Sequence, residues 1–173
     1  MPDASPYASL SRHQRPRTSD KRALLALSRS IEARALASAP HADLWVSLQH
    51  VRFHSGRTRR LHVDLAAAGV RVHVYGVRVR DGRPAPDAMS CHDISEFGPL
   101  AQEWDVLLVT PELGLGLAAR QVEPLLPDHD SDDMTRRFDW VLSEDRADVA
   151  YAAAALPGET FVLGRDFGAR RPA

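Results

Sequence analysis

Three aspartates near the C-terminal third of the chain have the spacing of calcium ligands. Asp128, Asp130 and Asp132 alternate as the first carboxylates of a calcium-binding loop do. That loop needs glycine at its sixth position and glutamate at its twelfth, and the chain has Asp133 and Asp139 there. We therefore expect a solvated acidic loop rather than a metal site.

The histidines and the single cysteine form no recognisable catalytic or metal-binding motif. His50 and His54 are four residues apart, but at the junction of an expected strand and loop, and no HExxH pair occurs. With Cys91 and His92 they would bind a metal only if the fold gathered them. Apart from His92, no pattern beside Cys91 would activate it as a nucleophile. We predict no metal site and no catalytic residue, and the sequence leaves any cofactor unknown.

Two glycines follow an expected strand, as in a dinucleotide-binding turn. Gly114 and Gly116 are followed by Ala119, so the GxGxxG pattern is incomplete. The glycines fall inside a predicted helix rather than before it, and Glu112 would repel a phosphate at the helix start. We expect these glycines to allow close packing of a helix on a sheet.

The strongest lead is a carboxylate on the apolar face of the first long helix. At about 100° per residue, Ser28 and Glu32 fall within the arc that Leu24, Leu27 and Ile31 define. A buried carboxylate costs several kcal/mol unless a donor meets it. Glu32 must therefore have a partner.

Two interpretations of this carboxylate follow from the sequence. In one, Arg29 or Arg52 pairs with Glu32 and fixes the helix on the sheet. In the other, Ser28 and Glu32 line a pocket at the sheet edge, with nearby aromatic residues as walls for a flat ligand. The ligand-binding residues that we predict are Ser28, Glu32, Arg52, Phe53, Tyr75 and Trp104.

Composition indicates a soluble globular protein. The 173 residues suit one domain with short extensions, and 44% are apolar, which is an ordinary globular value. No apolar run reaches the roughly 18 residues that cross a bilayer, and the N-terminus lacks a secretory signal. We expect a cytoplasmic protein that does not bind membranes.

The net charge of −1 conceals an uneven distribution. Residues 1–80 contain 14 Lys and Arg against five Asp and Glu, whereas residues 81–135 contain two against 12. The basic half would attract an acidic partner, or it would face the acidic segment within the fold. Because no aromatic residues are interleaved with the arginines, we do not expect nucleic acid as the partner.

The expected elements alternate between helix and strand. Helices are predicted over residues 21–38, 55–68, 111–122 and 145–156, and strands over 43–49, 70–79, 104–110 and 138–143, with an edge strand within 92–97. Such alternation favours an α/β fold with a mostly parallel central sheet of four to five strands, flanked by about four helices. Residues 1–17 are expected to form a flexible tail, 18–157 the domain, and 158–173 a C-terminal tail.

Five segments of the chain form a recognisable series. They are an "LSxxIE"-like helix (Leu27, Ser28, Ile31, Glu32), an "RF" loop (Arg52, Phe53), a "GVxVxVxG" strand (Gly69–Gly76), "PLAxEW" (Pro99–Trp104) and an "RxF" strand start (Arg136, Phe138). Together they resemble the DICT domain, a sensory domain family associated with diguanylate cyclases and two-component systems. The resemblance covers roughly Lys21–Leu156.

This resemblance implies a sensor for signal transduction and not an enzyme. The expected partners are a small-molecule ligand or a signalling protein, with a homo-oligomer as a further assembly. We identify no kinase, cyclase or helix-turn-helix segment in the chain, so the output is expected to belong to a separate protein. Two alternatives stay open: an α/β enzyme that acts on a nucleotide or phosphoester, and an arginine-rich module associated with nucleic acid.

Overall fold

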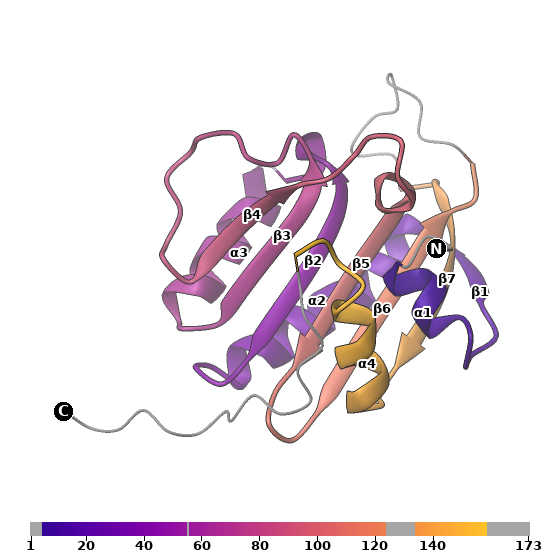
Figure 1. Cartoon of the computed structure of the whole chain (residues 1–173), viewed down its shortest axis with the longest axis horizontal. Helices are drawn as coiled ribbons and strands as arrows, with labels where there is room; N and C mark the ends of the chain where they lie inside the picture. The colour runs from indigo at the N-terminus through magenta and orange to yellow at the C-terminus, as the bar shows by residue number, and fades with distance from the viewer. Residues whose placement is uncertain (1–4, 55, 124–133, 159–173) are drawn as a thin grey trace.

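The computed structural model describes residues 5–54, 56–123 and 134–158, which form one seven-stranded sheet between two pairs of helices (Figure 1). The strands are β1 (Arg17–Asp20), β2 (Asp43–His50), β3 (Arg71–Val77), β4 (Met89–Asp93), β5 (Glu103–Val109), β6 (Gly114–Gln121) and β7 (Arg137–Ser143). The helices are α1 (Pro6–Leu10), α2 (Lys21–Ala37), α3 (Gly56–Ala67) and α4 (Arg146–Ala153), with 3₁₀ turns η1 (Val51–Phe53) and η2 (Pro99–Gln102).

The sheet is mixed and mostly antiparallel. Its order is β1-β7-β6-β5-β2-β3-β4, and only the β2–β3 and β3–β4 pairs are parallel. The α/β class is confirmed, but the expected mostly parallel sheet of four to five strands is wrong. The strands that the sequence did not predict are β1 and β6, and the edge strand β4 begins earlier than the segment in which we expected it.

The predicted helix over residues 111–122 is also wrong, because this segment forms β6. The Thr110 hydroxyl accepts hydrogen bonds from the backbone N–H groups of Glu112 and Leu113, which closes a tight turn after β5. The chain then returns antiparallel to β5. A Cβ atom at Gly114 would lie 2.6 Å from the Cα of Arg146, so glycine here lets α4 approach the sheet. The glycines therefore do serve close helix–sheet packing, but they lie in the strand.

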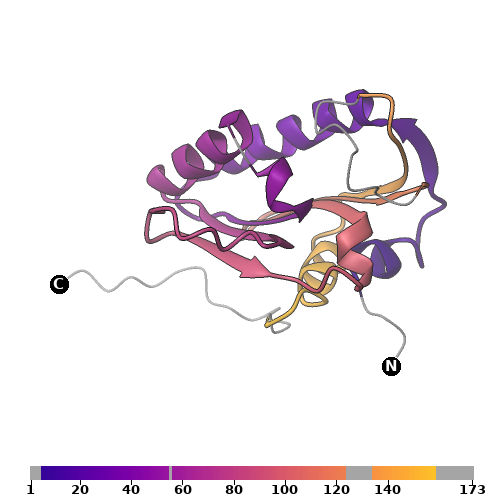
Figure 2. The same cartoon turned by 90° about the horizontal axis from the view of Figure 1, so that it is seen from above.

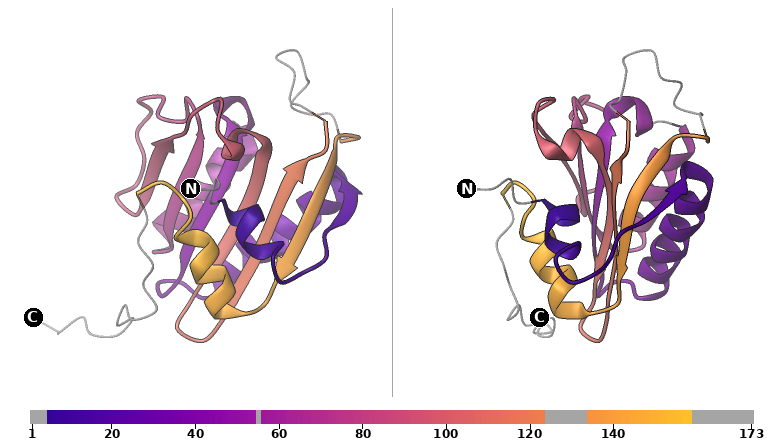
Figure 3. Two further views of the ribbon diagram at one scale, coloured as in Figure 1. Left: turned by 45° about the vertical axis from the view of Figure 1, so that its right-hand side comes forward. Right: turned by 90° about the vertical axis from the view of Figure 1, so that its right-hand side faces the viewer.

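Each face of the sheet carries its own hydrophobic core. Helices α2 and α3 cover one face, and α1 and α4 cover part of the other (Figure 2; Figure 3, right). Because strand side chains alternate, Trp104 and Val106 face the α2–α3 side, whereas Leu107 faces α1 and α4. The two cores are thus separated by the sheet itself.

The N-terminal residues are more ordered than the sequence suggested. Part of the expected flexible tail forms helix α1, whose Tyr7 and Leu10 are buried. The Ser5 hydroxyl donates to Glu103 Oε1 at 2.6 Å, and the Tyr7 backbone N–H donates to Glu103 Oε2 at 3.3 Å. This part of the predicted tail is therefore wrong: buried contacts hold residues 5–10 on the sheet.

Most other elements agree with the sequence. The predicted helices at α2, α3 and α4 and the predicted strands at β2, β3, β5 and β7 are confirmed. Asp20 caps α2 by accepting from the backbone N–H of Ala23 at 3.0 Å. The acidic loop that we expected around residues 128–135 lies mostly outside the described residues, as do Ser55, where we expected the second helix to begin, and residues 159–173. None of the described helices combines the length and apolar character needed to span a membrane.

Candidate functional site

A pocket of about 420 Å³ lies between the sheet and the α2–α3 layer. Its floor is apolar and comes from the central strands, through Val46 and Leu48 of β2 and Trp104 of β5. Helix α2 forms one wall, the first turn of α3 forms another, and η1 with the segment just before β7 closes the end. The polar and charged lining residues are Lys21, Ser28, Arg29, Glu32, Gln49, Arg52, Arg57, Thr58 and Arg136. Pockets of roughly 300–1,000 Å³ hold small organic ligands, so this volume suits a compact molecule.

Glu32 is buried, as predicted, but its partner is a histidine of α3. His62 Nε2 lies 3.2 Å from Glu32 Oε1, and His62 Nδ1 lies 3.1 Å from His54 Nε2. Neither Arg29 nor Arg52, the partners that we expected, forms this contact. The chain of His54, His62 and Glu32 links the η1 turn, α3 and α2, and it holds the carboxylate at the pocket wall.

Burial makes the protonated form of His54 unfavourable and so lowers its pKa. Desolvation lowers the pKa of His54 to about 3, and the neighbouring His62, Arg59 and Arg83 add to the effect. His54 is consequently neutral at physiological pH, and its ring stacks on His62 with centroids 5.2 Å apart. A neutral ring has one donor and one acceptor nitrogen, which suits a hydrogen-bond chain.

Ser28 carries the clearest sign of a missing contact. Its side chain lines the pocket, it is 3% exposed, and its hydroxyl has no hydrogen-bond partner among the described residues. Buried polar atoms are nearly always paired, since an unpaired one costs about 1–3 kcal/mol. A bound molecule in the pocket would supply the partner.

Positive side chains converge on the ring of Phe53 at the other end of the pocket. The guanidinium carbon of Arg136 lies 4.6 Å from the ring centroid, that of Arg52 5.0 Å, and the Lys21 ammonium 5.6 Å. All four residues line the pocket. Cations over an aromatic face are attracted to its π-electrons, but three of them together repel one another. This end of the pocket therefore carries positive charge around an aromatic ring.

A strained residue of β2 completes this end of the pocket. Gln49 has φ of 64°, in the left-handed region, at the irregularity that interrupts the register of β2 with β3. Its side chain donates to Gln121 Oε1 at 3.1 Å, and Arg136 donates to both glutamines at 3.4 and 3.2 Å. Such strain persists only where surrounding contacts enforce it, and it is frequent at binding sites.

The fold brings five of the six predicted site residues together. Ser28, Glu32, Arg52, Phe53 and Trp104 line the pocket. Tyr75 does not: it is buried in the core on the α1–α4 side, where its ring stacks on His92 at 4.6 Å. The reason is strand alternation, which points Val74 toward the pocket side and Tyr75 away from it.

Sequence reasoning also missed several residues of the site. It assigned neither Lys21, Gln49 nor Arg136 to the site, although Arg136 belongs to the "RxF" strand start. It also missed His62, whose signal is its position three residues before Leu65 on the apolar face of α3.

The other candidates from the sequence form no second site. Within the described ranges, no group of three or more His, Cys, Asp or Glu residues has the geometry to hold a metal ion. Cys91 is half-buried, and desolvation raises the pKa of its thiol. A raised pKa makes a thiol a poorer nucleophile at neutral pH, because less thiolate is present.

Comparison with known families identifies the chain. Residues 6–121 match the DICT family, described as a sensory domain in diguanylate cyclases and two-component systems. This chain belongs to the DICT family. The matched segment of this DICT domain runs from α1 to the end of β6, so it includes α2, α3 and the pocket residues that they contribute. The resemblance predicted from the sequence is thereby confirmed.

Comparison with individual proteins adds little. No curated protein matches the chain. Among solved structures, it is similar to TrmBL2, an archaeal chromatin protein whose structure shows a novel mode of DNA binding. The two chains are 11% identical with a TM-score of 0.42, and the alignment covers 80% of this chain and 48% of TrmBL2. This chain thus spans about half the length of TrmBL2, and a likeness at this level carries no argument.

Proposed function

We propose that this DICT domain is a non-catalytic sensor that binds a small molecule in the pocket beneath α2 and α3. Binding shifts a conformational equilibrium, and a separate signalling protein responds to the shift. The sensory character of the family supports the role, and the pocket supports the place. The proposed binding residues are Ser28, Glu32, Arg52, Phe53 and Trp104.

The buried Ser28 hydroxyl carries this proposal. A folded protein gains nothing by burying a hydroxyl without a partner, and replacing serine by alanine in a helix costs nothing in helix propensity. The hydroxyl lines a pocket of suitable volume. A ligand that hydrogen-bonds to it accounts for both observations.

The pocket residues favour binding over reaction. A serine nucleophile needs a base within hydrogen-bond reach, and the Ser28 hydroxyl has no such contact among the described residues. Glu32 lies against His62 and not against Ser28. These side chains are therefore arranged to hold a molecule rather than to activate a nucleophile.

The arrangement of the walls supports a sensory response. The pocket lies between segments that are distant in sequence, namely α2, η1, α3 and the residues just before β7. A ligand that contacts all of them favours the conformation in which they are close together. It shifts the equilibrium by as much as its affinity differs between the two conformations.

Native mass spectrometry of the freshly purified protein tests the proposal. We expect a co-purifying small molecule, or failing that, at least one compound in a metabolite library that raises the melting temperature. Ser28→Ala should weaken the binding of that compound, whereas Ser30→Ala, on the exposed side of the same helix, should not. If no compound is retained and none raises the melting temperature, the proposal is wrong.

A further inference from the structure

Two polar side chains of α2 border the pocket side by side without bonding to each other. Ser28 and Glu32 are four residues apart, so they lie one turn apart on the same face of the helix. Both line the pocket, and they are 3% and 7% exposed. Together they indicate a class of ligand, and this inference rests on the proposed function because it concerns the same pocket.

The Ser28 hydroxyl lacks an acceptor. In a helix, serine can donate to the carbonyl one turn earlier, but the Ser28 hydroxyl bonds to no described residue, and Glu32 lies against His62 instead. Among buried backbone groups, donors without a partner are rarer than under-satisfied acceptors. By the same reasoning, the group that should meet this hydroxyl is an acceptor such as a carbonyl oxygen.

The Glu32 carboxylate can accept a further hydrogen bond. Its Oε1 lies 3.2 Å from His62 Nε2, and its Oε2 forms no hydrogen bond to a described residue. An ionised carboxylate accepts up to about four hydrogen bonds and donates none. A ligand group that meets Oε2 must therefore donate, and a negative charge beside it would be repelled.

The two buried histidines behind Glu32 hold its carboxylate in place. His62 contacts Glu32 through Nε2 and His54 through Nδ1, at 3.2 and 3.1 Å, and both rings are almost fully buried. Because an ionised Glu32 has no proton to donate, His62 Nε2 is the donor of this contact. The contact fixes Oε1 and leaves Oε2 available to a ligand.

The floor beside these two groups is apolar and suits a flat ring. Trp104 of β5 lies opposite Leu48 of the adjacent β2, and Val46 is the next β2 residue on the same face. Leu25 of α2 and Leu61 of α3 line the pocket from the helices. A planar ring in the pocket therefore meets apolar side chains of the sheet and of the helices, which offer it a large contact area.

We propose that the ligand is a compact planar heterocycle whose edge carries a carbonyl beside a ring N–H, as in a cyclic amide. The Ser28 hydroxyl donates to the carbonyl, and the Glu32 carboxylate accepts from the N–H. The ring lies on Trp104 and Leu48. An acceptor and a donor on one edge thus match the donor and the acceptor on one helix face. The ligand class depends on these four residues and not on the cations around Phe53.

Two cyclic amides and their N-methyl derivatives test the ligand class on the full chain. Hypoxanthine and 4-quinazolinone each carry a ring N–H beside a carbonyl, and methylation of that nitrogen removes the donor but keeps the carbonyl. Titration calorimetry, or ligand-observed NMR for weak binding, measures the affinities. We expect at least one cyclic amide to bind at least tenfold more tightly than its methylated derivative, because the methyl group leaves the Glu32 carboxylate without a donor.

Variants assign the two contacts. Ser28→Ala should weaken a cyclic amide and its methylated derivative by a similar factor, because both compounds keep the carbonyl, whereas Ser30→Ala on the exposed side of α2 should change neither. Glu32→Gln should reduce the tenfold ratio between the two compounds, because an amide oxygen accepts more weakly than a carboxylate. Asp64→Asn, at an exposed position of α3, is the control for Glu32→Gln. Ser28→Ala still tests the site should Glu32→Gln fail to fold.

Two results would overturn the ligand class. One is that neither cyclic amide binds more tightly than its methylated derivative, which includes the case that neither binds. The other is that Ser28→Ala affects binding no more than Ser30→Ala does. If native mass spectrometry finds a compound that lacks such an edge but requires Ser28, the ligand class is wrong and the proposed function stands. If no compound of any kind binds, both fail.

Discussion

The two faces of the sheet bury ionisable groups in opposite ways. On the α1–α4 side, Glu103 and Asp105 of β5 are buried, and desolvation raises the pKa of each. For Asp105 the charge of Glu103 raises the pKa further. On the α2–α3 side, desolvation lowers the pKa of His54 to about 3. One face therefore prefers protonated carboxyls, and the other a neutral imidazole.

These preferences give the two faces opposite dependence on pH. An acid whose pKa is raised on folding binds more protons in the folded state, so its contribution to stability falls as pH rises above its unfolded pKa. A histidine whose pKa is lowered binds more protons when unfolded, so stability is lost as pH falls below about 6.5. The folded domain is thus weakened from both directions, by a different face in each case.

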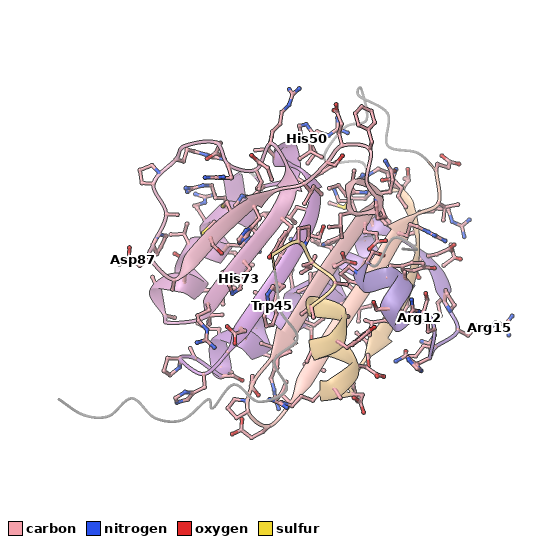
Figure 4. All side chains as sticks on the ribbon, viewed as in Figure 1. Arg12, Arg15, Trp45, His50, His73 and Asp87 are labelled. Atoms are coloured by element: carbon pink, nitrogen blue, oxygen red, sulfur yellow. The ribbon has the colours of Figure 1, made fainter. Side chains whose placement is uncertain are left out.

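The faces also differ in how the buried polar groups are used. Glu103 is satisfied by Ser5 and Tyr7 of the α1 segment, and it fixes that segment on the sheet. Glu32 and Ser28 instead border a cavity. On the α1–α4 side, none of the described helices covers the half of the sheet formed by β2, β3 and β4, where the rings of Trp45 and His73 stack with their centroids 5.4 Å apart (Figure 4). One face therefore ties its buried carboxylate to the N-terminal segment, and the other leaves buried polar groups at the cavity where we propose that a ligand binds.

The largest loss of stability should come from adding a side chain at Gly114, where α4 packs closely on the sheet. Gly114→Ala places a Cβ 2.6 Å from the Cα of Arg146, and a backbone atom cannot give way as a flexible side chain can. We expect a loss of about 3 kcal/mol in the free energy of unfolding by urea denaturation. Gly98→Ala is the control, since its Cβ would meet nothing closer than 3.6 Å. An equal loss in both variants would contradict this account.

The next largest effect concerns the buried imidazole on the pocket side. Between about pH 7 and about pH 4.5, His54 should contribute a loss of about 2–3 kcal/mol in wild-type stability, because only the unfolded state gains its proton. His54→Gln should remove this part of the pH dependence. His13→Gln, at an exposed position, should leave it unchanged. Parallel pH profiles for wild type and His54→Gln would show that His54 is not buried as described.

Asp105, the buried carboxyl on the α1–α4 side, should make stability change with pH in the opposite direction. Above about pH 4 the Asp105 carboxyl should reduce stability by up to about 1.4 kcal/mol per pH unit until its raised pKa is reached. Asp105→Asn removes this titration, so its stability should fall less with pH than that of the wild type. The exposed Asp64→Asn serves as control. Thermal melts from about pH 4 to about pH 8 measure how stability changes with pH. If Asp105→Asn keeps the wild-type dependence, the two faces do not respond to pH in opposite ways.

The smallest effect is a gain in stability without ligand. Ser28→Ala removes a buried hydroxyl that has no partner among the described residues, so the free protein should become about 1 kcal/mol more stable. Ser30→Ala on the exposed side of α2 corrects for helix propensity. Chemical denaturation of ligand-free protein provides the comparison. A loss of stability specific to Ser28→Ala would mean that the hydroxyl has a structural role, and the binding interpretation would lose its main support.

The burial of Ser28 and Glu32 could be predicted because helical periodicity is local, but the pocket lies over the central strands β2 and β5 and not at the sheet edge where we expected it. The arc that contains Ser28 and Glu32 follows from α2 alone, and so does the expectation that Glu32 is buried. Its partner could not be predicted, because His62 reaches it through the packing of α3 beside α2. Tyr75 was assigned to the wrong face, since the register of β3 in the sheet decides which alternate residues face the pocket.

The sheet topology was predicted wrongly in large part because of one segment, residues 111–122. Leu113, Leu115 and Leu117 alternate with two glycines, which is a period of two, yet the segment also resembled a helix that starts at Pro111. Interpreting it as a helix turned the β5–β6 hairpin into a crossover, and the expected sheet became parallel. What decides the matter is the pairing of β6 with both β5 and β7, a set of tertiary contacts that no local pattern contains.

Strand β1 passes into helix α2 without a loop. Asp20 is both the last residue of β1 and the cap of α2, and the next residue, Lys21, lines the pocket while its backbone N–H donates to the Arg136 carbonyl at 2.8 Å. No loop residue separates Lys21, at the cationic end of the cavity, from β1, the outermost strand in the sheet order, so a displacement of Lys21 also displaces β1.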